Sequence, residues 1–116
     1  MFSFAPDKVC VISKETKIKG NIQFESPCII YGEVEGDVES NKSIIIETNG
    51  FFKGVIKCPE IYIRGKIKGE IECGNILIYD KGTAEGDIWC DSIEIHEGGQ
   101  FIGIRHEKKK EKENTT

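Results

Sequence analysis

The sequence predicts an all-β chain whose short parallel strands wind into a single solenoid, a β-helix of about six coils. A seven-residue phrase, Gly-x-apolar-x-Gly-x-apolar, occurs in four complete copies, which begin at Gly32, Gly50, Gly65 and Gly82. Incomplete copies at 16–22 and 99–105 bring the total to six, and the second glycines of the six copies lie 15 to 18 residues apart. A repeat of this length, with apolar residues at every second position, is typical of stacked β coils.

Aligning the six copies places the apolar residues in columns that would fill the interior of the solenoid. One column contains Ile12, Ile30, Ile46, Ile63, Ile78 and Ile95, and another contains Ile18, Val34, Phe52, Ile67, Ala84 and Phe101. Branched aliphatic residues dominate these columns, as they do in strands that are buried on one face. At about 4.8 Å per coil, the stack would form a rod roughly 30 Å long.

The second glycine of each phrase shares the parity of the core residues, so we expect it to mark a corner without room for a Cβ atom. Coil length is predicted to vary at one corner only, where two extra residues enter before the leading glycine. The inserted segments end at 48–50, 80–82 and 97–99, and their Asn, Asp and Gly residues favour turns with positive φ. The same register pairs opposite charges, Lys17 with Glu33 and Lys19 with Glu35.

Composition limits the classes of function. The chain has 116 residues and a formal net charge of −4, which indicates one domain and argues against nucleic acid as a main partner. We find neither a secretory signal nor an apolar run long enough to span a bilayer, so we expect a cytoplasmic protein. Five cysteines without a CxxC pair fit reduced thiols in such a compartment.

The chain divides into three parts. Residues 1–9 form a short N-terminal tail, residues 10–105 carry the repeat, and residues 106–116 form a charged C-terminal tail. The last segment has no apolar face, so nothing in it offsets the entropy of ordering and we expect it to be disordered. The two histidines, His96 and His106, are expected in solvated turns.

Three of the repeated phrases, at 18–22, 32–38 and 82–88, resemble the bactofilins, which are bacterial polymer-forming cytoskeletal proteins. The resemblance covers residues 10–105 and implies a right-handed, roughly triangular β-helix. It also implies filaments formed by end-to-end contact without a nucleotide. Such filaments would act as scaffolds at the inner face of the cytoplasmic membrane and would position cell-wall enzymes or their membrane adaptors, so shaping the cell. The chain departs from the pattern at Thr16, which replaces a leading glycine, and at Arg105, which enters an apolar column.

The two ends of the solenoid are the predicted polymer interface. An uncapped coil exposes apolar side chains and a row of unpaired backbone groups, and both invite contact with another copy. The residues expected there are Phe101, Ile95 and Arg105 in the last coil and Ile12, Ile18 and Phe24 in the first. Phe101 is the expected key contact and Arg105 a register or capping residue. The alternatives are ordinary core packing for Phe101 and a frayed strand end for Arg105.

The N-terminal tail contains Met1, Phe2 and Phe4, which we interpret as a small membrane contact. Three apolar residues bind a membrane only marginally, but a filament would present many copies. The alternative is a tail that is disordered or folds over the first coil.

Two other functions stay open. The first is a non-polymerising adaptor that binds a partner through the outward residues Phe51, Val55, Tyr62, Trp89, Ile102 and Ile104. The second, less favoured, is a hexapeptide-repeat acyltransferase with His96 as its base, which the irregular coil length and the alternation by two argue against. We predict no catalytic residue and no cofactor, since no nucleotide-binding glycine loop is present. Cys58, Cys73 and Cys90 share an inner column and are expected as buried apolar thiols, not as metal ligands.

Overall fold

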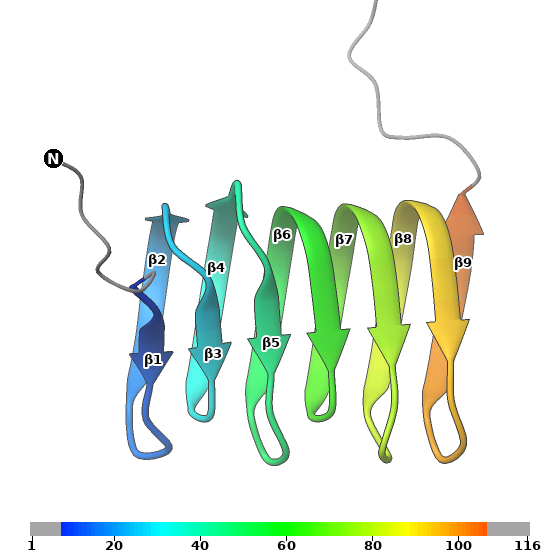
Figure 1. Ribbon diagram of the computed structural model, residues 1–116, viewed down its shortest axis with the longest axis horizontal. Coiled ribbons are helices and arrows are strands. Elements are labelled where there is room, and N and C mark those ends of the chain that lie inside the picture. Colours follow the sequence, from blue (N-terminus) through cyan, green and yellow to red (C-terminus); the bar gives the residue numbers. More distant parts are fainter. Residues whose placement is uncertain (1–7, 107–116) are drawn as a thin grey trace, which may run out of the picture.

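The computed structural model describes residues 8–106 as a parallel β-solenoid, and this part of the chain contains no helix (Figure 1). The strands are β1 (Cys10–Ile12), β2 (Lys17–Phe24), β3 (Cys28–Ile30), β4 (Glu33–Ser40), β5 (Ile44–Ile46), β6 (Phe51–Ile63), β7 (Lys66–Ile78), β8 (Thr83–Ile95) and β9 (Gln100–His106). The nearer strands run downward and the more distant strands upward while the chain advances from left to right, which is a right-handed winding (Figure 1). The predicted fold class is therefore confirmed.

The register of the coils is the one that the repeat predicts. Every strand pairs in parallel with the equivalent strand of the next coil, and the inner columns follow from these pairs. Coil 1 comprises residues 10–24, coil 2 28–40, coil 3 44–58, coil 4 61–73, coil 5 76–90 and coil 6 93–106. The inner column that begins at Ile22 ends at Arg105, as the alignment of the phrases predicts.

The glycine corner is also confirmed. The second glycines have φ between 131° and 146°, a region that side chains with a Cβ atom rarely adopt. From coil 2 onward, a Cβ atom at this position would collide with the carbonyl oxygen of the glycine in the preceding coil. The glycines therefore form a stacked column in which each backbone closely approaches the next.

Coil length varies at two corners, so the prediction of a single variable corner was wrong. The second variable corner follows the column of Phe24, Ser40 and the inner cysteines. Cys28 lies four positions after Phe24, and Ile44 lies four positions after Ser40. In both places one strand ends and a new strand begins. Three steps separate Cys58 from Ile61, and β6 continues without a break, as do β7 and β8 at the same corner (Figure 1).

The turn chemistry agrees with the sequence. Asn49, Asp80, Lys81 and Gly98 all have positive φ, and they lie in the three inserted turns. The predicted cross-coil pairs form as long ion pairs, with Lys17 Nζ 4.0 Å from a Glu33 carboxylate oxygen and Lys19 Nζ 3.9 Å from one of Glu35.

His106 departs from its predicted place in a solvated turn. It is the last residue of β9, and its ring stacks on Trp89 at 4.3 Å between centroids and 6° between planes. The reason is register, because His106 is the cross-strand neighbour of Trp89. His96 is exposed in the turn after β8, as expected. His106 was also the first residue of the tail expected to be disordered; the rest of that tail, 107–116, and the membrane residues Met1, Phe2 and Phe4 lie outside the described residues.

Candidate polymer interface

Within residues 8–106, the strands of the two terminal coils each have a backbone edge without a strand partner. Strand β1 pairs only with β3, β2 only with β4, β9 only with β8, and residues 92–95 of β8 only with β7, whereas the other strands pair on both sides. These edges present backbone donors and acceptors in the spacing of a parallel sheet. Such edges are templates for pairing with another chain.

Incomplete burial of the core is confined to the same two coils. In coils 2 to 5, every residue of the inner columns is at most 7% exposed. The half-buried apolar residues that pack against this core are Cys10, Ile18 and Ile22 in coil 1 and Ile93 and Phe101 in coil 6. Ile95, also in coil 6, is 48% exposed. The exposed core surface therefore lies at the two ends of the solenoid.

The six predicted interface residues occupy different environments. Phe101 and Ile18 are half-buried, and Ile95 and Arg105 are exposed. Ile12 and Phe24 belong to coil 1 but are only 4% and 9% exposed, so they offer little accessible surface. Sequence reasoning missed Ile22 and Ile93, which are half-buried at the ends. Taking every inner-column member of the first and last coils would have found them.

The last coil is apolar on its outer side as well. Ile102 is 51% exposed and Ile104 is 59% exposed. Their cross-strand neighbours in coil 5 are Glu85 and Asp87, so both positions change from charged in coil 5 to apolar in coil 6. Strand β9 thus carries apolar side chains on both faces along an unpaired edge.

Arg105 and His106 end the described chain at this coil. The Arg105 guanidinium donates a hydrogen bond of 3.3 Å to the carbonyl oxygen of Asp91, the residue that directly follows coil 5. His106 is half-buried on Trp89, and its Nε2 atom is enclosed without a hydrogen-bond partner among residues 8–106. A buried nitrogen of this kind is costly unless it finds a partner.

A family model for bactofilins, described as polymer-forming cytoskeletal proteins, matches residues 10–105. The chain belongs to the bactofilin family. The family is a structural, cytoskeletal one, and that is the role of this chain.

A solved structure of a bactofilin has the same fold. The chain matches the atomic structure of the cytoskeletal bactofilin BacA, determined by solid-state NMR, with a TM-score of 0.79. The two sequences are 23% identical, and the match covers 84% of this chain and 94% of the other. No curated protein sequence matches the chain. Among the described residues of this bactofilin, no helix is long and apolar enough to cross a membrane.

The inner cysteines of this bactofilin are free thiols. Burial, followed by the nearby Cys10, raises the pKa of Cys28, and a hydrogen bond with Cys58, followed by burial, raises the pKa of Cys73. Both thiols are therefore protonated at neutral pH, which disfavours metal binding because the thiolate is the ligand form. Residues 8–106 contain no group of three or more side chains arranged to hold a metal ion.

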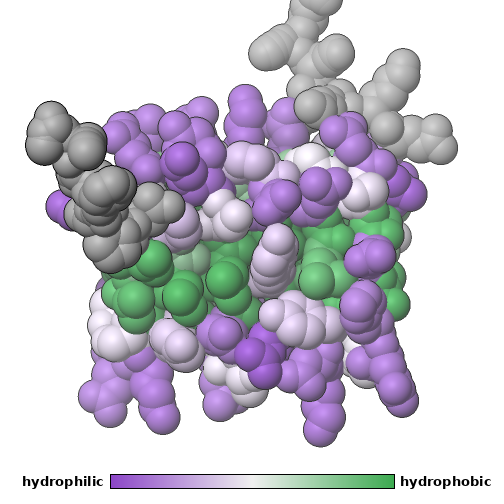
Figure 2. Space-filling view, in the orientation of Figure 1, coloured by the Kyte–Doolittle hydropathy of each residue, from purple (hydrophilic) through white to green (hydrophobic). Residues whose placement is uncertain are grey.

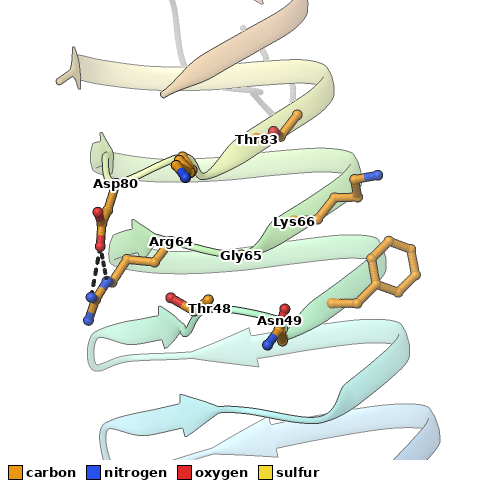
Figure 3. A pocket seen from close by; sticks show the side chains of 10 residues that line it. Thr48, Asn49, Arg64, Gly65, Lys66, Asp80 and Thr83 are labelled. Carbon is orange, nitrogen blue, oxygen red and sulfur yellow. Dashed lines mark hydrogen bonds and ion pairs between the residues drawn. The ribbon is translucent and has the colours of Figure 1, made fainter. Parts of the chain in front are cut away.

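A hollow of about 610 Å³ lies beside a short turn of coil 4 (Figure 3). It exists because Ile63 and Gly65 are separated by one residue, Arg64, while the turns of the adjacent coils are two residues longer. The Arg64 guanidinium lies 2.8 Å from an Asp80 carboxylate oxygen and 3.0 Å from one of Glu47. Arg64 therefore links the turns of three successive coils at the edge of the hollow.

Proposed function

We propose that this chain assembles end to end into filaments through its terminal coils, without a nucleotide. The observation that carries the proposal is that half-buried core side chains and unpaired strand edges coincide in coils 1 and 6. A second copy stacked on either end would bury this surface and continue the sheet. Contact between unlike ends produces an open fibre, and contact between like ends does so when it occurs at both ends of the solenoid.

The filament would act as a scaffold at the inner face of the cytoplasmic membrane. We expect it to collect cell-wall enzymes or their membrane adaptors there and so to influence cell shape. Met1, Phe2 and Phe4 would supply weak individual membrane contacts that the filament multiplies. Deleting residues 2–5 should therefore greatly reduce the pelleting of filaments with phospholipid vesicles, while filaments still form. Unchanged pelleting would reject the anchor.

The substitution Phe101→Arg tests the end-to-end contact. Burying a fully exposed phenylalanine is worth roughly 1.5–3 kcal/mol, so completing the burial of the half-buried Phe101 is worth a part of that, and an unpaired charge in the same place costs more. We expect a folded protein that no longer forms filaments, as measured by circular dichroism and negative-stain electron microscopy.

A matched control is Phe51→Arg. Phe51 is a half-buried phenylalanine on the outside of coil 3, beside Glu33. This variant should fold and polymerise like the original protein.

Filaments of the Phe101→Arg variant that look unchanged would show that the terminal face is not the interface. Loss of its circular dichroism spectrum would assign Phe101 to ordinary core packing. Sedimentation at several dilutions distinguishes the filament from the non-polymerising adaptor. A species whose size stays the same at every dilution would exclude a polymer and favour the adaptor.

A further inference from the structure

Every cysteine of the chain lies in an inner column beside another cysteine of the next coil. Cys10 is the direct cross-strand neighbour of Cys28, and we call these two residues the terminal pair. Cys58 is the neighbour of Cys73, which is in turn the neighbour of Cys90, and we call these three residues the inner stack. All five are free thiols, so the solenoid holds one group of stacked thiols at its first end and another in its interior.

The spacing of the terminal pair is one that a disulfide bond can span. Neighbouring strands lie about 4.8 Å apart, and the Cα atoms of bonded cysteines lie about 4.4–6.8 Å apart. Both side chains point inward, because each cysteine is the first residue of a strand whose third residue, Ile12 or Ile30, is buried. Burial, followed by the charge of Cys10 and a hydrogen bond with it, raises the pKa of Cys28, so the two thiols are close enough to interact.

The terminal pair differs from the inner stack in its accessibility. Cys10 is half-buried in the first coil, whereas the members of the inner stack are at most 5% exposed. Figure 2 shows that apolar side chains reach the surface at the end of the molecule where coil 1 lies. A small oxidant in solution can therefore reach Cys10 but not the inner stack.

The terminal pair also differs in its freedom to move. Strand β1 has three residues and pairs only with β3 among residues 8–106 (Figure 1), whereas β6, β7 and β8 at the inner stack are long and continuous. Stacked Cβ atoms must approach from about 4.8 Å to within about 4.5 Å to form a disulfide bond. Coil 1 can make this small shift because no described coil holds it on the other side.

We propose that Cys10 and Cys28 are a redox pair, which a hydroperoxide converts into a reversible disulfide bond that closes coil 1 onto coil 2. Cys10 reacts first because it is the accessible thiol. Its sulfur loses a proton and attacks one oxygen of hydrogen peroxide, the O–O bond breaks, and a sulfenic acid and a water molecule form.

The second step uses the neighbouring thiol. The sulfur of Cys28 attacks the sulfur of Cys10, the S–S bond forms, and the S–O bond breaks. The hydroxyl group leaves with the proton of Cys28 as a second water molecule, so a Cys28 thiol that is protonated at the start supplies what the leaving group needs. Both thiols are oxidised and the peroxide is reduced to water. A dithiol reductant reverses the reaction by thiol–disulfide exchange.

The bond would restrain the coil that the ladder holds least. Terminal elements of a fold open most readily, and a disulfide bond restricts the open states of the loop that it closes, here residues 10–28. In the proposed filament a neighbouring copy covers coil 1, so oxidation would act on unassembled chains and on filament ends. This effect on filaments rests on the proposed function, but the bond itself does not.

Peptide mapping tests the bond. Trypsin cuts after lysine and arginine, so each cysteine lies on its own peptide, 9–14, 20–42, 58–64, 69–81 or 82–105. Full-length protein, too dilute to assemble, is treated with hydrogen peroxide, and the remaining thiols are alkylated in denaturant before digestion. We expect mass spectrometry to find peptides 9–14 and 20–42 joined, with the loss of two hydrogen atoms, and separate after treatment with dithiothreitol. The other three peptides should be alkylated and not joined.

Hydrogen exchange tests the closing of coil 1. Amides of residues 10–24 should exchange at least about tenfold more slowly in the oxidised protein than in the reduced protein. Cys10→Ser should remove both the joined peptides and the difference in exchange. The matched control is Cys58→Ser, which should keep both. Serine suits this column, because Ser40 donates to the carbonyl oxygen two residues later at 3.1 Å as Cys58 does at 3.4 Å. Circular dichroism checks that both variants fold.

The other outcomes contradict the inference. It is overturned if no peptides are joined, if peptides of the inner stack are joined in equal yield, or if two copies of peptide 9–14 are joined, which is a bond between chains. Joined peptides 9–14 and 20–42 with unchanged exchange in residues 10–24 would overturn the closing of coil 1. Because the protein is unassembled throughout, none of these results depends on whether filaments form.

Discussion

At the scale of single residues, the stacked glycines determine where each coil bends. Gly54 has φ of 135°, and a Cβ atom there would collide with the Gly36 carbonyl oxygen. Gly20 has nearly the same φ, 133°, but nothing lies within 4 Å of its Cβ position, because no coil precedes coil 1 among the described residues. The two glycines therefore separate the cost of backbone strain from the cost of close stacking.

We predict that Gly54→Ala destabilises the chain much more than Gly20→Ala. Gly20→Ala should cost about 1–3 kcal/mol, the usual range for an unfavourable φ, whereas Gly54→Ala adds the backbone collision. Urea unfolding at protein concentrations too low for assembly measures both. Equal losses of stability would mean that close stacking between the glycines contributes nothing.

Most inner residues could be predicted from the sequence, because alternation by two and the repeat together specify a column for each of them. The exceptions have particular causes. Ile12 and Phe24 were expected at an accessible end but are buried, because a side chain's exposure depends on neighbours that a column does not specify. His106 was expected in a turn, yet register places it on Trp89, and a charged sequence after it concealed the end of the strand.

At the scale of elements, the sequence shows where turns are long but not where strands break. The steps from Ser40 to Ile44 and from Cys58 to Ile61 differ by one residue. The four-residue step preserves parity and so resembles an uninterrupted strand, but Ser40 there forms a local turn, in which its hydroxyl accepts a hydrogen bond from the Lys42 N–H at 3.0 Å. Side chains that bind their own backbone compete with the ladder in this way.

The long turns lie outside the hydrogen-bonded ladder, so they should tolerate shortening. Deleting residues 80–81 would give coil 5 the Ile78-Tyr79-Gly82 turn that coil 4 has as Ile63-Arg64-Gly65. We predict a folded protein whose free energy of unfolding changes by about 1 kcal/mol, because loop closure depends weakly on length and the deleted Asp80 takes with it one partly exposed ion pair to Arg64. Thermal and urea denaturation check this.

The control deletion removes the same number of residues from inside strand β7, at 70–71. It preserves parity but shifts every later inner residue of the coil away from its column. This variant should fail to fold. If it unfolds no more easily than the 80–81 deletion, the ladder does not determine stability as described here.

At the scale of the whole molecule, the fold and the ends follow from one physical fact. Each coil buries its apolar face only against its neighbours, so the first and last coils are necessarily incomplete. The sequence therefore predicts both the solenoid and the position of its contact surfaces. It does not show one outward surface directly, the row of Val11, Ile29, Ile45, Tyr62 and Leu77, because these residues look scattered until the register aligns them.

Fibre diffraction from aligned filaments tests the central claim, that solenoids join end to end, most directly. If the solenoid axis runs along the filament, the spacing between coils gives a reflection near 4.8 Å on the meridian. Filaments built by stacking solenoids side by side would place that reflection on the equator. A meridional reflection is the predicted result, and an equatorial one would contradict end-to-end assembly.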